Sequence, residues 1–325
     1  MSDQPGPKRV FLIGATGTIG RATARALVQA GHAVVCFVRP ETKSLPEFAG
    51  ATVRFGHVTD PASLARDGFC GERFDALVSC LTSRTGAPGD AWAIEHDAHV
   101  AALDAAKAAG VGHMVLLSAI CVQKPLLAFQ RAKLAFEKVL IESGIDYSIV
   151  RATAFFKSLS GQVDRVKQGK SFLVFGDGTK TACKPISDDD LARFIAACLT
   201  DPERRGRILP IGGPGEAITP RQQAEQLFAL MGRKARISSV PVALLDTIIF
   251  ALSALGRVVP SLRDKAELAR IGRYYATESM LVLDPVTGQY SADATPSTGS
   301  ETLLDFYARL IAGKASIERG EHAVF

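Results

Sequence analysis

The chain has 325 residues, enough for one large α/β unit or about two domains. Hydrophobic residues make up 47% and charged residues 22%, which is ordinary for a globular protein. The net charge of +5 is spread along the chain without a basic cluster, so nucleic acid is not an expected partner.

The N-terminus and the cysteines narrow the protein class further. Residues 1–8 are short and polar, so we expect a disordered lead-in without a signal or transit peptide, and a cytoplasmic location. The six cysteines are far apart and form no CxxC pair, which argues against zinc and iron–sulfur sites. We therefore expect no resident metal.

The first predicted element is a buried strand that ends in a glycine-rich loop. The apolar run Arg9–Ile13 stops at Gly14, and a helical pattern follows to Ala30. Gly14 permits a tight turn, Gly17 lets the backbone approach a pyrophosphate, and Gly20 lets the helix pack on the sheet. A pyrophosphate is favoured at such a helix N-terminus. The residues expected to contact a dinucleotide here are Gly14, Thr16, Gly17, Thr18, Ile19 and Gly20.

The next strand, Ala33–Val38, ends at Arg39. Sites specific for NAD usually place an acidic residue there to bind the ribose 2′-hydroxyl. A guanidinium is suited to a 2′-phosphate instead. Arg39 therefore predicts NADPH as the cofactor, although Glu41 lies nearby.

Strands and helices then alternate along the chain. Such alternation predicts a parallel, Rossmann-like doubly wound sheet over residues 9–155. The polar positions after the strands share one rim of that sheet, where cofactors bind. We expect strands at 51–55, 74–81, 113–118 and 147–150, and helices starting after Asp60 and spanning 90–109 and 126–143. Further cofactor contacts are expected from Asp60, Leu81 and Thr153.

The second half is less regular and is expected to form a smaller, mostly helical substrate lobe over residues 156–325, with segments returning to the Rossmann core. Residues 188–199, 222–231 and 262–270 resemble helices, the first with a solvated acidic start, Asp188–Asp190. The apolar segment Val240–Leu255 is either a buried helix or an exposed one that contacts a membrane surface or a large flat ligand.

Five other positions are candidates for a structural or a ligand-binding role. Phe155 and Phe156 follow the sixth strand near the cofactor rim, so a pocket position is expected for them. Tyr274 contacts either the ligand or the core. His96 and His99 have no acidic or cysteine partners nearby in a metal-binding pattern, so a surface or capping role is expected.

The glycine spacing resembles that of the extended and atypical short-chain dehydrogenase/reductases. That group uses a Ser after the fifth strand and a Tyr-x-x-x-Lys motif on the next helix. Ser118 and Lys133 match, but Phe129 stands where the tyrosine is expected. A phenylalanine cannot donate a proton, so reduction of a double bond becomes more plausible than carbonyl chemistry.

Longer segments sharpen the resemblance to the NADPH-dependent 8-vinyl reductases of chlorophyll and bacteriochlorophyll biosynthesis. The resemblance implies that a divinyl (proto)chlorophyllide, a magnesium tetrapyrrole, is reduced to the ethyl form by NADPH. It implies Lys133 and Ser118 as the catalytic residues, with Lys133 also as a cofactor contact at the nicotinamide ribose. It further implies a location at or near the photosynthetic or inner membrane. The segments that carry it are residues 117–133, 153–159, 175–178 and 271–285.

Two other functions stay open. Loss of the tyrosine is also seen in NADPH-binding sensors and assembly factors of this fold, which turn nothing over. An isoflavone-reductase-like enzyme would share the lysine without the tyrosine. Peripheral membrane contact is a further expectation, and no feature of the sequence indicates an oligomeric state.

Overall fold

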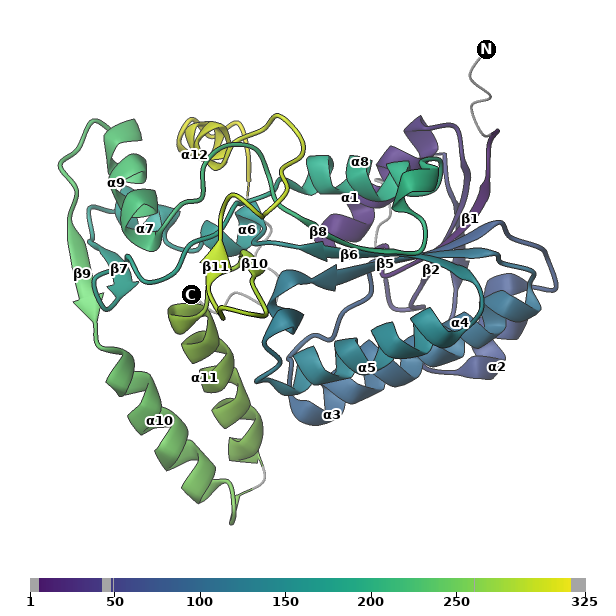
Figure 1. The fold of residues 1–325 in the computed structure, drawn as a ribbon, viewed down its shortest axis with the longest axis horizontal. Helices are drawn as coiled ribbons and strands as arrows, with labels where there is room; N and C mark the ends of the chain where they lie inside the picture. The colour runs from purple at the N-terminus through teal and green to yellow at the C-terminus, as the bar shows by residue number, and fades with distance from the viewer. Residues whose placement is uncertain (1–5, 43–47, 49, 260, 317–325) are drawn as a thin grey trace.

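The computed structural model describes residues 6–42, 48, 50–259 and 261–316 (Figure 1). Seven parallel strands form the central sheet in the order β3-β2-β1-β4-β5-β6-β8. This order reverses between β1 and β4, as in a doubly wound dinucleotide-binding fold, so the predicted fold class is confirmed. The strands are β1 (Arg9–Ile13), β2 (Ala33–Val38), β3 (Thr52–Phe55), β4 (Ala76–Ser79), β5 (His113–Ala119), β6 (Asp146–Ala152) and β8 (Arg207–Ile211).

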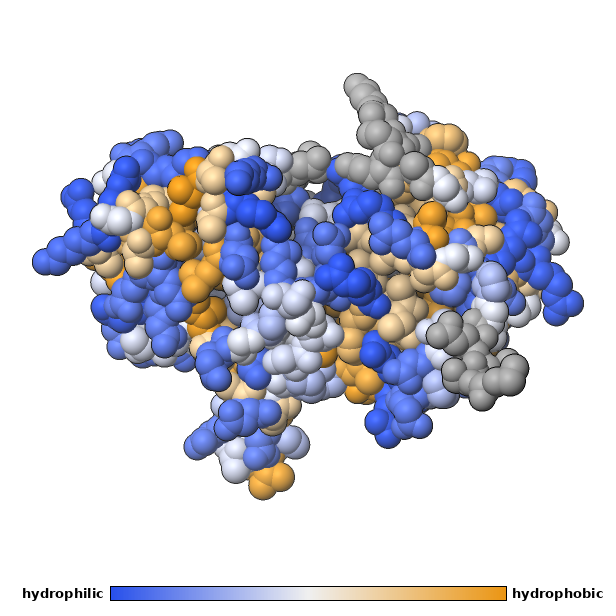
Figure 2. All heavy atoms as spheres, turned by 90° about the horizontal axis from the view of Figure 1, so that it is seen from above, coloured by the Kyte–Doolittle hydropathy of each residue, from blue (hydrophilic) through white to orange (hydrophobic). Residues whose placement is uncertain are grey.

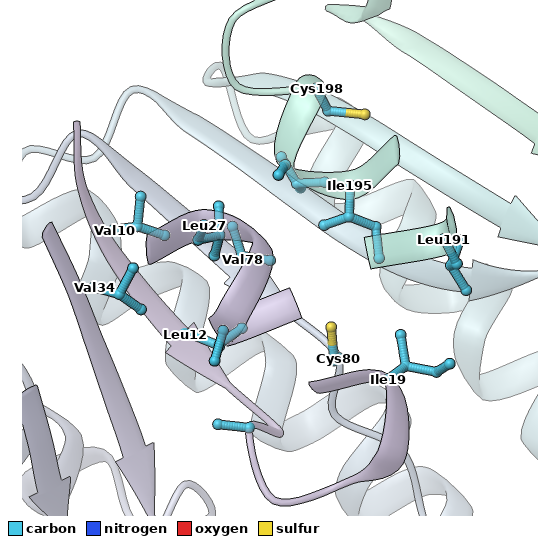
Figure 3. Packing of buried hydrophobic residues seen from close by; sticks show 14 of the residues in the cluster. Val10, Leu12, Ile19, Leu27, Val34, Val78, Cys80, Leu191, Ile195 and Cys198 are labelled. Carbon is cyan, nitrogen blue, oxygen red and sulfur yellow. The ribbon is translucent and has the colours of Figure 1, made fainter. Parts of the chain in front are cut away.

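Helices cover both faces of the sheet, which explains why its strands are apolar runs rather than alternating patterns. One face is covered by α1 (Thr18–Gln29) and α8 (Asp188–Ala197) (Figure 1). Leu27 of α1 and Ile195 of α8 pack there over the same buried cluster (Figure 3). The other face is covered by α2 (Pro61–Ser63), α3 (Pro88–Ala91), α4 (Ala98–Ala108) and α5 (Ala128–Glu142).

Two of the helices on this second face contain a wide, π-helical turn. Leu64–Phe69 continues α2, and Trp92–Asp97 joins α3 to α4 without a break. The helix predicted over 90–109 is therefore present, with a π-helical segment inside it. At the start of α2, the Asp60 carboxylate accepts a hydrogen bond from the Ala62 amide, 3.0 Å away. Asp60 is thus the N-cap that was predicted.

The lobe beside the sheet has its own core around the buried Phe228 and Tyr307. The chain does not stay in this lobe: after β7 it returns to the sheet for α8 and β8, and then leaves again. The elements of the lobe are α6 (Phe156–Leu159), α7 (Val163–Lys167), β7 (Phe172–Phe175), α9 (Pro220–Leu230), β9 (Ile237–Val240), α10 (Val242–Leu255), α11 (Ser261–Thr277), β10 (Val282–Leu283), β11 (Tyr290–Ser291) and α12 (Leu303–Ile311).

Helices α10 and α11 pack on each other as a hairpin that extends away from the rest of the molecule (Figure 1). No residue of α10 is buried, so the interpretation of Val240–Leu255 as a buried helix is wrong. The apolar composition of such a segment does not distinguish a helix that tertiary packing covers from one that it leaves exposed. None of the described helices is both long and apolar enough to cross a membrane.

Two predictions of solvated polar residues are also wrong. At the start of α8, Asp190 is buried, and its carboxylate accepts hydrogen bonds from the Ser187 hydroxyl and from the backbone amides of Ser300 and Glu301. His99 is buried as well: its Nε2 lies 2.8 Å from Ser79 Oγ. In both cases a partner distant in sequence compensates the loss of water.

Candidate functional site

The glycine loop follows β1 directly, and two of its glycines have no substitute. Gly14 has φ +75°, and a Cβ there would lie 2.4 Å from the backbone of Cys80 and Leu81 at the end of β4. A Cβ on Gly20 would lie 2.1 Å from the Gly14 carbonyl oxygen. The predicted tasks of Gly14 and Gly20, a tight turn and close helix packing, are confirmed.

The N-terminus of α1 is shaped to receive an anion. Gly17 is the N-cap, no side chain caps the helix, and its first turn holds no acidic residue. The first backbone N–H groups and the helix dipole are therefore available to a phosphate. The Ile19 side chain belongs to the buried core, so only its backbone can serve a ligand. The residues present fit a dinucleotide pyrophosphate.

The other predicted cofactor residues lie where parallel strands end. Arg39 is exposed just beyond β2, and Leu81 follows β4. Thr153, after β6, is buried, and its hydroxyl donates to the Lys184 carbonyl oxygen. Because all these strands run in the same direction, these positions share the rim that carries the glycine loop. The contacts of these residues with a cofactor remain predictions.

Lys133 is held by a carboxylate that was not predicted. Its Nζ lies 2.7 Å from Glu95 Oε2, and the Glu95 side chain is only 1% exposed. The other oxygen, Oε1, accepts from the hydroxyls of Thr82 and Ser83 and from the Ser83 amide. Burial alone would raise the pKa of Glu95, but the ammonium of Lys133 and these hydrogen bonds lower it on balance. The site therefore contains a buried carboxylate–ammonium pair.

Ser118, like Lys133, is held by a buried carboxylate. Its hydroxyl donates to Glu137 Oε1, 2.5 Å away, and Arg151 pairs with the other carboxylate oxygen. Since the Ser118 proton is engaged by Glu137, the hydroxyl oxygen is left to accept a hydrogen bond from another group. Lys133 and Glu137 are four residues apart on α5, so one face of this helix carries both side chains to the ends of the strands.

One sequence signal could have found both carboxylates. Glu95 follows the spacing of the buried Ala91, Ala98 and Ala102, and Glu137 lies beside the buried Phe136 and three residues before the buried Leu140. An acidic residue on the apolar stripe of a helix is buried, and a buried acid needs a partner.

The phenylalanine at the usual tyrosine position lies in an apolar contact between the two lobes. Phe129 packs against the cluster that contains Ile271 and Tyr274 of α11. The Tyr274 hydroxyl donates to the Cys121 carbonyl oxygen, 2.9 Å away, and burial raises the pKa of this phenol. The second lobe thus reaches the sheet rim through α11.

The two phenylalanines after β6 are not equivalent. Phe156 is buried in the core of the lobe against Phe306, which is the position of a core residue and not of a pocket lining. Phe155 is only partly buried and packs at the edge of the sheet's core. Of the pair, only Phe155 remains a candidate for ligand contact.

Lys157, which is not among the predicted cofactor residues, contacts the glycine loop. Its Nζ donates to Thr18 Oγ1 at 2.9 Å, in the first turn of α1. It also lies near Asp188, whose carboxylate atom Oδ1 is buried without a hydrogen-bond partner among the described atoms. Burial and the neighbouring Asp189 raise the pKa of Asp188 to about 6. Lys157 therefore adds a positive charge beside the expected pyrophosphate position.

Comparison with known proteins agrees with this geometry. The NAD(P)H-binding family matches residues 14–202. The divinyl chlorophyllide a 8-vinyl-reductase of Oryza sativa subsp. indica is 48% identical over 99% of this chain and 83% of its own, and that of Zea mays is 48% identical over 97% and 82%. The NADPH complex of the quinone oxidoreductase QOR2 from Escherichia coli has the same fold, with a TM-score of 0.67 at 20% identity over 93% of this chain and 99% of that one. The chain thus belongs to the NAD(P)H-binding family and, within it, to the divinyl chlorophyllide a 8-vinyl-reductases.

Proposed function

We propose that the protein reduces the 8-vinyl group of 3,8-divinyl chlorophyllide a or protochlorophyllide a to an ethyl group, with NADPH as the reductant. The observation that carries this proposal is the 48% identity to 8-vinyl-reductases over nearly the whole chain, α10 and α11 included. Vinyl and ethyl differ by one hydride and one proton, and NADPH supplies the hydride when it is bound.

Cofactor binding is assigned to the sheet rim. The glycine loop and the α1 N-terminus receive the pyrophosphate, and Lys157 adds a positive charge beside it. Arg39 at the end of β2 binds the 2′-phosphate and selects NADPH over NADH.

Phe129 supports double-bond chemistry. Carbonyl reduction creates an alkoxide that needs a nearby acid, which Tyr-x-x-x-Lys supplies in related enzymes and Phe129 cannot. Hydride addition to the outer vinyl carbon leaves charge that spreads into the conjugated macrocycle, and the proton is added at the inner carbon. The reaction therefore needs less local charge stabilisation than carbonyl reduction does.

Lys133 and Ser118 act by positioning the nicotinamide and its ribose. Glu95 holds one N–H of the Lys133 ammonium, and the two remaining donors are assigned to the nicotinamide ribose. Ser118, whose proton is engaged by Glu137, accepts a hydrogen bond from the nicotinamide amide. Both groups fix the orientation of the reactive face, and orientation is the main contribution that a protein makes to hydride transfer between two flat reactants.

We assign Phe155 to contact with the macrocycle, because it follows β6 at the cofactor rim and is only partly buried. Tyr274 is buried in the cluster that includes Phe129, which is the position of a core residue. We also propose that the enzyme meets this large apolar substrate at a membrane surface.

The deciding experiment is an anaerobic assay of the purified protein with 3,8-divinyl chlorophyllide a and either NADPH or NADH. Loss of one vinyl group from conjugation shifts the Soret band to the blue, and chromatography identifies the product. We expect conversion with NADPH and little with NADH. Tight NADPH binding without turnover of any pigment would instead favour a non-catalytic sensor or assembly factor, and turnover of aromatic enones alone would favour an isoflavone-reductase-like enzyme.

A further inference from the structure

The hairpin of α10 and α11 exposes apolar side chains that the fold leaves uncovered. Phe250 is 77% exposed, Leu255 57% and Val258 84%. Leu255 ends α10, and the exposed Val258 and Val259 lie in the turn after it, at the end of the hairpin that is farthest from the sheet (Figure 1). Together with Phe250, in the half of α10 nearer this turn, these residues form what we call the apolar tip.

Most residues of α10 are exposed, and most of these are apolar. Val242, Leu245, Ile249 and Leu252 are only partly exposed, and they recur at the spacing of one helix face. That face packs on α11. Leu244, Ile248, Ala251 and Leu255 recur at helical spacing on the exposed side of α10, which also carries Thr247.

Charge is arranged around this surface in a defined way. The one acidic residue of α10, Asp246, pairs with Arg273 of α11. The turn after α10 and the first residues of α11 carry Arg257, Arg263 and Lys265 against a single acid, Asp264. The end of the hairpin is therefore both apolar and positively charged.

Seen from above, the molecule shows hydrophilic residues over much of its surface, with hydrophobic residues in groups between them (Figure 2).

We propose that the hairpin docks the protein on an anionic lipid surface, with the apolar tip inserted among the headgroups and Arg257, Arg263 and Lys265 against the lipid phosphates. Apolar insertion and basic charge are the two contributions that hold interfacial helices on membranes. A second copy of the chain fits less well, because a symmetric pairing of the tips would bring the two basic clusters together. This inference adds a membrane-docking site to the proposed function, and it depends on that function only for the identity of the pigment that the enzyme takes from the lipid surface.

The test is co-sedimentation of the full chain with vesicles of phosphatidylcholine alone and of phosphatidylcholine mixed with phosphatidylglycerol. We expect binding to the mixed vesicles and much weaker binding to the neutral ones. The double substitution Phe250→Ser with Leu255→Ser, and separately Arg257→Glu with Lys265→Glu, should each reduce partitioning at least about tenfold. The matched control is Leu126→Ser with Val286→Ser, because both residues are exposed apolar residues outside the hairpin and should leave binding unchanged.

Turnover of divinyl chlorophyllide dispersed in detergent separates this inference from the proposed function. Full activity of the Phe250→Ser, Leu255→Ser variant in detergent, together with lost vesicle binding, is the expected pair of results. The inference is overturned if the wild-type protein ignores anionic vesicles, or if control and hairpin variants bind them equally. It is also overturned if ultracentrifugation shows a wild-type dimer that the hairpin substitutions dissociate. A pigment-binding role replaces it if these substitutions raise the KM in detergent without affecting vesicle binding.

Discussion

Glu95 and Glu137 are both almost fully buried, and each orients one of the two residues assigned to catalysis. Burying a carboxylate costs several kcal/mol unless it is paired and fully hydrogen-bonded. Lys133 with Ser83 and Thr82, and Arg151 with Ser118, provide those partners. The side chains of the site are therefore fixed before any ligand arrives, which is the condition for efficient orientation of reactants.

Arg39 is the residue that should decide cofactor choice. In Arg39→Ser the guanidinium that is assigned to the 2′-phosphate is absent, so the KM for NADPH should rise about 10- to 100-fold while that for NADH changes little. Steady-state kinetics with each cofactor measures this. Arg66→Ser is a suitable control because Arg66 is exposed and pairs with Asp67. Equal effects on NADPH and NADH would contradict the assignment.

Lys157 should act on binding of the cofactor phosphates. Lys157→Met removes the charge beside Thr18 and the α1 N-terminus, so the Kd for NADPH should rise about tenfold or more. Fluorescence titration of NADPH without pigment measures binding alone. Lys167→Met, on the exposed surface of α7, should leave the Kd unchanged. An unaltered Kd in Lys157→Met would mean that Lys157 only ties the lobe to the loop.

At the scale of elements, the N-terminus of α8 holds the segment before α12 in place. Asp190 accepts from Ser187 within its own cap and from the amides of Ser300 and Glu301 far along the chain. A Cβ on Gly299 would lie 2.0 Å from the Asp190 carboxyl carbon, so the backbone approaches this side chain as closely as glycine permits. One side chain thereby connects the sheet unit to the C-terminal part of the lobe.

The three successive aspartates allow a matched comparison of stability. Asp190→Asn should lower the free energy of unfolding by about 2–3 kcal/mol, because charge-assisted hydrogen bonds in a buried site are lost. Asp189→Asn removes an exposed carboxylate 3.1 Å from Arg25 and should cost less than about 1 kcal/mol. Urea unfolding of both variants measures the difference. Equal losses in the free energy of unfolding would show that Asp190 does not hold the segment before α12 in place.

The elements themselves were largely predictable, and their surroundings less so. Strands such as Arg9–Ile13 were found because a continuous apolar run that ends at glycine is typical of a parallel strand covered on both faces. The exposure of α10 was not predictable, since apolar composition alone does not say whether another element covers a helix. The burial of Asp190 was missed because its partners Ser300 and Glu301 are brought close only by the tertiary fold. The burial of Glu95 could be predicted from its place on an apolar helix stripe, but its pairing with Lys133 could not.

Around the glycine loop, too, local backbone features were predictable and contacts between distant segments were not. Gly14 and Gly20 could be assigned their tasks from spacing, because the backbone alone determines the turn. Lys157 could not, since its contact with Thr18 depends on how the second lobe sits on the first.

At the scale of the whole molecule, two buried histidines make the fold sensitive to acid. Burial lowers the pKa of His99 and of His113 to about 4, from an ordinary value of 6.5. Between pH 6.5 and pH 4 the unfolded chain therefore binds protons at these histidines that the folded chain does not bind. The free energy of unfolding is accordingly highest above pH 6.5 and decreases as the pH falls toward 4. Each histidine should cost about 2 kcal/mol at pH 5. Asp188, whose pKa is raised to about 6, acts in the opposite direction.

His113 is suited to test this, because it lies at the start of β5, the end of that strand away from Ser118. His113→Gln cannot take up a proton, so the loss in the free energy of unfolding between pH 7.5 and pH 5 should shrink by about 2 kcal/mol. Urea unfolding at the two pH values gives the comparison within each protein and removes any constant effect of the substitution. An unchanged loss in the variant would show that His113 does not contribute.

The return of the chain to the sheet for β8 has a consequence for synthesis on the ribosome. Strand β6 ends at Ala152, but its outer neighbour β8 begins only at Arg207. At a translation rate of about 5–20 residues per second, the edge of β6 waits several seconds, unpaired, for the strand that covers it. An apolar strand with a free edge is the kind of surface that aggregates or recruits a chaperone. A nascent chain that stalls between these two strands should therefore be far more prone to aggregation than one that has completed β8.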